Sequence, residues 1–406
     1  MWQKHLTNFS NRFICMRMSQ ISGKIDGQPM FRILEQVQEL ERMGKRIAHF
    51  ELGEPDFDTP VHITNACIES LQSGNTHYAP SGGIHNLKVA AADATLKSRG
   101  FSPDIKQILV TPGANAIIYM TIKCLADVGD DILVPDPGFP TYFTAAAACG
   151  VNTVSVNLNV EDGFSLDPEE VEKKITPKTK LLILNSPSNP TGAVLSEDKI
   201  RKIFELCEKN KIYILSDEIY ARMIFSEEKF FSPSIIDECK RTTIILNGFS
   251  KAFAMTGWRL GIAIGPESLI DKMSLLVSTI NSCVPPFIQD AGIVALKGEQ
   301  KVVENMIREY ANRADYLANG LNEINGITCR KADGAMYVFA DIRGTGLSSE
   351  QFAETALHQC GVAVTPGLYF GKNGEGFVRF SVVRGLDDIN FALKSLKEYF
   401  NDKNGC

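Results

Sequence analysis

The chain has 406 residues and a formal net charge of −6, from 42 basic and 48 acidic residues. This length is enough for two or three units of domain size, each with a substantial apolar core. The nearly balanced charge gives no indication of a nucleic-acid-binding surface. No apolar run approaches the roughly 20 residues that a helix needs to span a bilayer. We therefore expect a protein that neither binds nucleic acid nor enters a membrane.

The ten cysteines are widely spaced, and none of them form a CxxC pair. Even the closest two, Cys124 and Cys149, are well separated along the chain. Such spacing fits neither a zinc site nor a compact disulfide scaffold. It predicts reduced thiols, a cytoplasmic setting and no metal centre.

The N-terminal residues 1–25 carry four lysines and arginines and no acidic residue. Basic ends without acids occur in organelle transit peptides, but the serine and arginine richness typical of those peptides is missing here. Translation from Met16 or Met18 is a further interpretation. The simplest expectation is that residues 1–24 form a flexible leader.

The regular elements begin with a helix predicted at 29–43, where apolar residues recur at helical spacing opposite a charged face. A short strand is predicted at 47–52, and a Gly-Glu-Pro-Asp turn follows it. From residue 107 onward, buried strands alternate with helices, which is typical of a largely parallel sheet covered on both faces. We expect these strands at 107–111, 132–134, 153–156, 181–185, 212–216, 243–247 and 260–264.

The composition changes after residue 264. Helices are predicted at 288–296 and 302–321, and strands near 334–341 and 376–382. This part reads as a smaller mixed unit that packs with the N-terminal helix. The expected organisation is an N-terminal segment at 25–52 that joins the small domain, a large domain at 53–295 and a C-terminal small domain at 296–400.

The strongest chemical signal lies in Asn-Gly-Phe-Ser-Lys-Ala-Phe-Ala-Met-Thr-Gly-Trp-Arg-Leu-Gly at 247–261. A lysine in apolar surroundings is disfavoured in its charged form, so the amine of Lys251 is readier to condense with a carbonyl. The guanidinium of Arg259 keeps its charge, and its planar fork suits a phosphate. Pyridoxal 5′-phosphate (PLP) carries both groups. The apolar neighbours expected around the amine are Phe249, Phe253 and Met255.

Two further patterns agree with such a ligand. The turn after the strand at 107–111 leads into a helix, whose free N–H groups and positive dipole end bind phosphate. Asp217 ends a buried strand, where a carboxylate is costly unless a cation meets it. A protonated pyridine nitrogen would be that cation. Sites in parallel sheets lie beyond the carboxyl ends of the strands, and the candidates obey this rule: Gly113, Asn189, Asp217 and Lys251.

The stretch from Ser250 to Gly261 resembles the lysine signature of the class I/II aminotransferases, PLP enzymes of fold type I that include the aspartate-aminotransferase-like proteins. The resemblance extends from about Gly53 to Arg379. It implies an α/β fold, in which a large domain with a mostly parallel seven-stranded sheet flanked by helices is joined to a smaller α+β domain. The implied activity moves an amino group between an L-amino acid and a 2-oxo acid by a ping-pong mechanism.

The resemblance also implies roles for single residues. Lys251 would bond covalently to the cofactor and move the proton, and Asp217, rather than Glu218, would keep the ring nitrogen protonated. Tyr220 and Asn189 would bond the pyridine 3-oxygen, and Phe139 would stack on the ring unless it is an ordinary turn aromatic. The remaining cofactor contacts would come from Gly113, Ala114, Asn115, Ser250 and Arg259, and from Tyr78 of the other subunit of a homodimer with shared active sites.

For the substrate, the resemblance implies that Gly53 approaches it through the backbone, that Asn189 contacts it, and that Arg379 binds its α-carboxylate. Arg379 belongs to an Arg-x-Ser element, which Arg384 does not match. An aspartate-specific branch has a lysine where this chain has Asn115, so aspartate, alanine, glutamate and aromatic donors all stay open. A β- or γ-elimination lyase, a cyclising synthase and a binding protein that retains the domain are the alternative functions.

Overall fold

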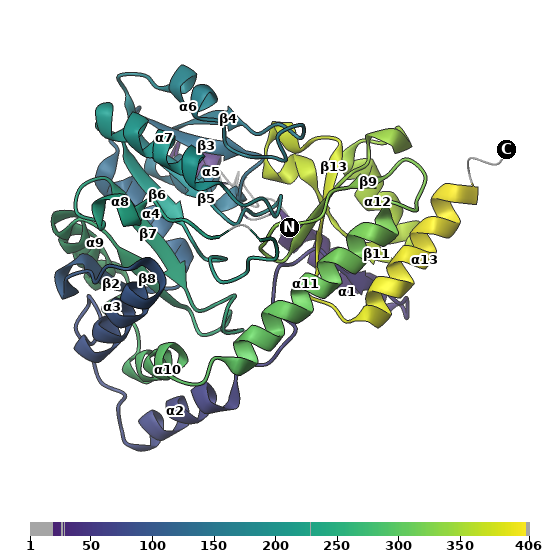
Figure 1. Cartoon of the computed structure of the whole chain (residues 1–406). Helices are drawn as coiled ribbons and strands as arrows, with labels where there is room; N and C mark the ends of the chain where they lie inside the picture. The colour runs from purple at the N-terminus through teal and green to yellow at the C-terminus, as the bar shows by residue number, and fades with distance from the viewer. Residues whose placement is uncertain (1–18, 26, 28, 228, 403–406) are drawn as a thin grey trace, which may run out of the picture.

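The computed structural model describes residues 19–25, 27, 29–227 and 229–402 (Figure 1). Most of the expected leader therefore lies outside the described residues, and so do the alternative start sites Met16 and Met18. The described end of that leader forms one short 3-10 helix, η1 (Ser22–Lys24).

The larger half of the molecule is built on a seven-stranded sheet with the order β2-β8-β7-β6-β5-β3-β4 (Figure 1). Strand β8 is antiparallel to both of its neighbours, whereas the remaining neighbours are paired in parallel. This confirms the largely parallel sheet expected from the sequence. The strands are β2 (Ile108–Pro112), β3 (Asp131–Asp136), β4 (Asn152–Asn157), β5 (Thr179–Asn185), β6 (Tyr213–Asp217), β7 (Thr243–Gly248) and β8 (Leu260–Ile264).

Helices cover both faces of this sheet, because its central strands are apolar on both sides. In β5, Leu181 and Ile183 pack with α4 (Ala114–Leu125), α5 (Pro140–Cys149) and α9 (Glu267–Asn281). Leu182 and Leu184 point the other way and pack with α6 (Pro168–Lys174) and α7 (Glu197–Lys209). The helices at the β2 and β8 end are α2 (Val61–Gln72), α3 (His85–Arg99) and α10 (Pro286–Lys297), and α8 (Ser234–Asp237) precedes β7.

The smaller half contains a four-stranded antiparallel sheet with the order β12-β13-β10-β9. Its strands are β9 (Thr328–Cys329), β10 (Tyr337–Asp341), β12 (Thr365–Pro366) and β13 (Phe377–Ser381). The helices that share its apolar core are α11 (Lys301–Leu321), α12 (Ser349–Cys360) and α13 (Leu386–Asp402). Helix α11 connects the halves, because Val303 in its first turn packs with the large sheet and Met306 already packs with the small one.

The N-terminal segment packs on the smaller half. Val37 and Leu40 of α1 (Met30–Arg42) pack against Leu357 of α12. Strand β1 (Ala48–His49) pairs in parallel with β11 (Val362–Ala363). Helices α1 and α12 thus pack together although they lie far apart in the sequence.

The strand predicted at 47–52 is wrong in its extent, because β1 contains only Ala48 and His49. The amide of Phe50 still donates to the carbonyl of Ala363 in β11 at 2.9 Å, but the carbonyl of Phe50 accepts a hydrogen bond of 2.9 Å from Ser381 N. The carbonyl of Glu51 accepts from side chains. The pairing of β1 with β11 therefore ends where the chain passes between the two halves.

Among the described residues, no helix has the length and apolar character needed to cross a membrane.

Candidate active site

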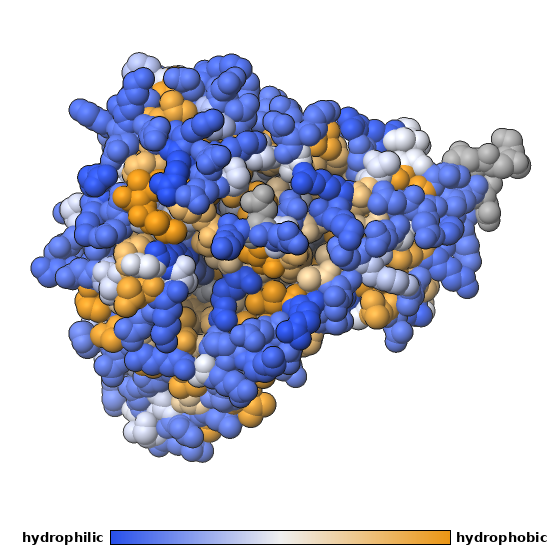
Figure 2. Space-filling model, viewed as in Figure 1, coloured by the Kyte–Doolittle hydropathy of each residue, from blue (hydrophilic) through white to orange (hydrophobic). Residues whose placement is uncertain are grey.

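A cavity of about 330 Å³ lies where the two halves meet. Asn185 and Asp217, the last residues of β5 and β6, line it from the large sheet, and Tyr337 and Arg379 line it from the small sheet. On the face shown in Figure 2, the surface between the two halves is hollowed and apolar residues are visible inside. The cavity thus lies beyond the carboxyl ends of parallel strands, as the sequence predicts.

Most of the residues singled out in the sequence meet in this cavity. Its lining includes Gly53, Ala114, Asn115, Phe139, Asn189, Asp217, Tyr220, Ser250, Lys251, Arg259 and Arg379. Gly113 lies directly behind Arg259, since a Cβ at Gly113 would be 2.3 Å from the Arg259 Nη2 atom. Tyr78 is the exception: it is 87% exposed and lines a different hollow, together with Cys283 and Phe287.

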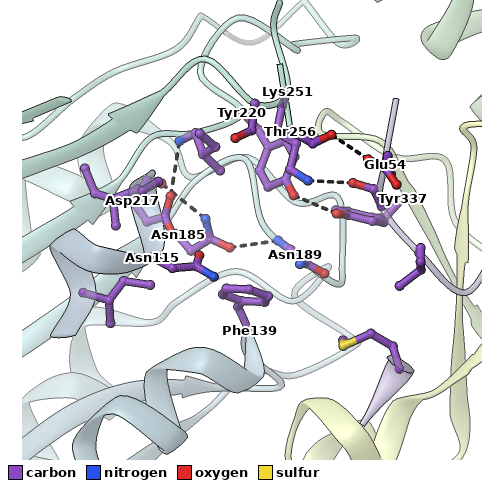
Figure 3. Close-up of a pocket in the computed structure, with 18 of the residues that line it drawn as sticks. Glu54, Asn115, Phe139, Asn185, Asn189, Asp217, Tyr220, Lys251, Thr256 and Tyr337 are labelled. Carbon is purple, nitrogen blue, oxygen red and sulfur yellow. Dashed lines mark hydrogen bonds between the residues drawn. The ribbon is translucent and has the colours of Figure 1, made fainter. Parts of the chain in front are cut away.

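The amine of Lys251 reaches into the cavity from the loop after β7. Its Nζ donates a hydrogen bond of 2.6 Å to the carbonyl of Gly53. A Cβ at Gly53 would be 2.0 Å from the Tyr337 hydroxyl, so this position requires glycine. Figure 3 shows Lys251 beside Tyr220 and Thr256, with Tyr337 next to them.

The expectation that these apolar side chains surround the amine is wrong. Phe249, Phe253 and Met255 are buried in the core shared with α3 and α10, and none of them lines the cavity. They anchor the underside of the loop, so that the side chain of Lys251 projects from its other side. The lining near the amine therefore includes the hydroxyl groups of Tyr220 and Thr256.

Asp217 is 4% exposed and faces the cavity from the end of β6. Its Oδ2 accepts a hydrogen bond of 2.7 Å from the Tyr142 hydroxyl, and its Oδ1 accepts one of 3.2 Å from the Ile219 amide. Burial raises the pKa of Asp217 to about 6, while these two hydrogen bonds lower it in part. A buried carboxylate with a raised pKa is stabilised as an anion when a cationic group enters the cavity beside it.

The neighbouring acid, Glu218, points to the opposite face, as strand alternation predicts. It pairs with Arg99 and accepts a hydrogen bond of 2.9 Å from the Ser216 hydroxyl. Because Glu218 has its own cation inside the protein, Asp217 is the acid of the two that can serve a ligand in the cavity.

Arg379 is 2% exposed and lies in the middle of β13. Its guanidinium donates to Asn189 Oδ1 at 2.9 Å and to the carbonyl of Glu51 at 2.6 Å. It also stacks over the Tyr337 ring at 4.5 Å, and Phe370 flanks it at 4.8 Å. Its Nε has no hydrogen-bond partner.

Burial lowers the pKa of Arg379, and the nearby Tyr337, Tyr220 and Glu51 counteract that effect. Within the described residues, the hydrogen bonds of Arg379 go to an amide, a carbonyl and a hydroxyl, and to no carboxylate. A buried cation without a carboxylate partner is costly. The arrangement therefore suits a carboxylate supplied by a ligand.

Arg384 does not reach this cavity. It lies beyond the end of β13 and lines a neighbouring hollow with His49 and Glu51. Arg384 and Arg379 therefore have different surroundings.

The other end of the cavity is built for an anion. Helix α4 begins at Ala114 without a side-chain cap, so its first amide groups are free to bind a ligand. The N-cap residue, Gly113, has φ +83°, a conformation that glycine adopts without strain. The guanidinium of Arg259 is held by a hydrogen bond of 2.8 Å from its Nη1 to the carbonyl of Thr256.

Among the lining residues to which the sequence assigns no role are Tyr142, Asn185 and Tyr337. Tyr142 follows Phe139 by one helical turn, a spacing that could have suggested a shared face. Asn185 Oδ1 accepts a hydrogen bond of 2.8 Å from the amide of Asn189, which shapes the turn between them. Tyr337 comes from the small sheet and is hydrogen-bonded at 2.7 Å to the Tyr220 hydroxyl, a contact that no local pattern predicts.

Together these groups fit PLP. The amine of Lys251 suits an aldehyde, the start of α4 with Arg259 suits a phosphate, and the buried Asp217 suits a protonated ring nitrogen. By contrast, the described residues contain no cluster of histidine, cysteine and acidic side chains that could hold a metal ion.

Comparison with known proteins agrees with this geometry. Residues 45–392 match the family "Aminotransferase class I and II". The chain belongs to this family. The resemblance seen in the sequence is thereby confirmed, and so is the fold expected from it.

Named relatives of this aminotransferase differ in substrate. It is 38% identical to an aspartate aminotransferase of Pyrococcus horikoshii, over 86% of this chain and 89% of the relative. It is 39% identical to aromatic-amino-acid aminotransferase 2 of Thermococcus litoralis, over 87% and 91%. The structure of an aspartate aminotransferase from Thermus thermophilus with maleate matches with a TM-score of 0.90 at 33% identity, over 94% of this chain and 100% of that one.

These similarities show an enzyme that transfers amino groups. They lend no support to the lyase, synthase and binding-protein alternatives, because the named relatives are aminotransferases.

Asp217 makes the stability of the cofactor-free protein depend on pH. Its pKa rises from 3.8 to about 6 on folding. Between about pH 4 and pH 6, the native state therefore holds a proton on Asp217 that the unfolded state has lost. The stabilisation of the folded protein by this group is complete below about pH 4 and is lost as the pH rises through about 6. We expect the stability difference between wild type and Asp217→Asn to fall by about 2–3 kcal/mol from pH 4 to pH 7. Urea unfolding measures it, and a difference independent of pH would contradict the assignment.

Proposed function

We propose that this aminotransferase uses PLP held by Lys251 to move an amino group between an L-amino acid and a 2-oxo acid in a ping-pong cycle. One observation carries the proposal. The amine of Lys251, the buried acid Asp217 and the buried cation Arg379 line a single cavity, and no carboxylate of the described residues pairs with Arg379.

When bound, PLP supplies an electron sink for the α-carbon of the substrate. Asp217 holds a proton on the ring nitrogen, and the cation there offsets the cost of burying the carboxylate. The 2.7 Å hydrogen bond from Tyr142 keeps this carboxylate pointed at the cavity. Lys251, once its amine is released from the cofactor, moves the proton at the α-carbon.

Other residues of the cavity lining would make the remaining contacts with the cofactor. Tyr220 and Asn189 would bond the 3-oxygen of the cofactor, and Phe139, which Figure 3 shows near Asn115 and Asn189, would stack on its ring. Gly113, Ala114, Asn115, Ser250 and Arg259 would hold the phosphate at the start of α4.

Arg379 binds the substrate α-carboxylate in this proposal. Its planar fork is fixed on two sides, by Asn189 and by the carbonyl of Glu51. Its guanidinium has five N–H groups, and its hydrogen bonds to Asn189, Glu51 and Thr365 leave some of them for a ligand. Gly53 forms the nearby floor, where the absence of a side chain lets the Tyr337 hydroxyl approach the backbone.

A second copy of the chain completes the site. Tyr78 is 87% exposed, and two large apolar residues of α9, Leu275 and Ile280, are 61% and 58% exposed. Exposed apolar groups of this kind mark an association surface. We propose that the surface forms a homodimer and that Tyr78 of each chain reaches the cofactor phosphate of its neighbour.

Three other features remain proposals. The domain boundaries are 53–295 for the large domain and 296–400 for the small one, with 25–52 joining the small domain. The cytoplasmic setting rests on the cysteine spacing in the sequence. The donor stays open among aspartate, alanine, glutamate and aromatic amino acids, and a donor screen with 2-oxoglutarate as acceptor will decide it.

Lys251 should carry the cofactor. We expect the purified protein to be yellow, and borohydride reduction to fix the cofactor's mass on the peptide that contains Lys251. Lys251→Ala should show no such adduct, whereas Lys88→Arg, made in α3 outside the cavity, should keep it. Peptide mass spectrometry measures the label, and labelling of another lysine would overturn the assignment.

Arg379→Lys should lower kcat/KM by at least about a hundredfold for every donor, because lysine cannot restore a two-bond contact worth roughly 1.5–3 kcal/mol per charged hydrogen bond. Cofactor absorbance should stay intact. Arg384→Lys is the matched control and should be nearly silent, since Arg384 lines a different hollow. Equal losses in both variants, or a loss limited to dicarboxylic donors, would contradict the α-carboxylate role.

The shared site can be tested by mixing two inactive chains. Tyr78→Ala and Lys251→Ala homodimers should both transfer poorly. A heterodimer of the two has one site that lacks both residues and one site that keeps both. Unfolding and refolding the mixture should therefore restore activity, up to about one quarter of the wild-type value for random pairing. No recovery, despite a confirmed heterodimer, would show that Tyr78 acts within its own chain.

A further inference from the structure

His49 lies between two carboxylates, outside the cavity. Its Nε2 is 2.9 Å from Glu41 Oε1 of α1, and its Nδ1 is 3.0 Å from Glu51 Oε1. A neutral imidazole has one N–H and can donate only one of these bonds, whereas the imidazolium donates both. The geometry therefore fits a protonated His49 that ties α1 to the segment after β1.

Glu51 needs this cation. Its side chain is 1% exposed, and its Oε2 has no hydrogen-bond partner. A buried carboxylate is costly unless a cation and hydrogen-bond donors compensate it. Within the described residues, His49 is the side chain that donates to Glu51. The hydrogen bond to Glu51 raises the pKa of His49, burial lowers it in part, and the bond to Glu41 raises it again.

The other charged groups that face this cluster do not replace His49. The same hollow is lined by Glu54, Asp56 and Arg384. Arg384 lowers the pKa of His49 through its charge, and its Nε is buried without a hydrogen-bond partner. The two acids add negative charge to the hollow and cannot donate to Glu51 when ionised.

The main-chain carbonyl of Glu51 bonds a side chain that lines the cavity. Its carbonyl accepts hydrogen bonds from Arg379 at 2.6 Å and from the Thr365 hydroxyl at 2.9 Å. Farther along the same segment, the carbonyl of Gly53 accepts from Lys251. One residue therefore binds His49 through its side chain and Arg379 through its backbone.

We propose that protonated His49 is a positioning residue, which clamps Glu51 to α1 and so fixes the carbonyl that orients Arg379 for the substrate α-carboxylate. This inference rests on the α-carboxylate role given to Arg379 above. When His49 loses its proton, one ring nitrogen turns a lone pair toward a carboxylate, and Glu51 loses its compensating charge. The clamp is complete below the ordinary pKa of histidine and is lost as the pH rises through the raised pKa.

The test measures, from pH 5 to pH 9, the affinity of the cofactor-loaded enzyme for an unreactive carboxylate, the deaminated analogue of its best donor. Wild type should bind more weakly as the pH rises. Glu41→Gln should move that fall to lower pH, because it removes one of the bonds that raise the pKa. His49→Gln should abolish the fall and bind about five- to tenfold more weakly at low pH, with kcat at saturation within about twofold.

The control is His358→Gln on the exposed surface of α12, which should keep the wild-type profile. Histidine hydrogen–deuterium exchange, read by mass spectrometry, should give His49 a pKa that falls in Glu41→Gln. If His49→Gln does not fold, the Glu41→Gln variant still tests the proposal, because Glu41 is half-exposed and its substitution is easier to tolerate. An alkaline fall that is unchanged in both variants would overturn the inference. Failure of every donor to transfer an amino group would instead overturn the proposed function.

Discussion

Two main-chain carbonyls, on Glu51 and Gly53, hold the two cationic side chains on which the cavity depends. The first binds Arg379 of the small sheet, and the second binds Lys251 of the large half. Glu51 and Gly53 lie two residues apart in one short segment, and each carbonyl bonds a side chain from a different half of the molecule. The segment from 51 to 53 thus links the two halves. A side chain at Gly53 would collide with Tyr337 and push this segment away.

Structural residues and site residues differ in whether another residue of the protein compensates their buried charge. Glu218 and Asp217 are adjacent and both buried, yet Glu218 pairs with Arg99 of α3, whereas the described hydrogen bonds to Asp217 come from the Tyr142 hydroxyl and the Ile219 amide. Arg379 is likewise buried, with no carboxylate among its hydrogen-bond partners in the described residues. Buried charges without internal partners are expensive in a folded protein. Their presence in one cavity indicates that a charged ligand is part of the functional state.

The site residues that could be predicted share one property. Lys251, Asp217, Asn189 and Gly113 lie in or next to local patterns, in which a buried strand runs into a short polar or glycine-containing turn. Tyr142 shares a helical turn with Phe139, so a local pattern could also predict its place in the site. No local pattern predicts the place of Tyr337, because its contact with Tyr220 joins residues far apart in the sequence.

By itself, the sequence determined the alternation of strands and helices, the largely parallel sheet and the lysine loop. These depend on periodicity, on turn residues and on a motif, all of which are local. Only the tertiary structure decided that β1 stops at His49, that Phe249, Phe253 and Met255 lie beneath the loop rather than around the amine, and that Glu51 links His49 to Arg379. Each of these depends on which distant segment supplies a hydrogen-bond partner or an apolar neighbour. Such pairings are settled by the packing of the whole chain, so no local pattern contains them.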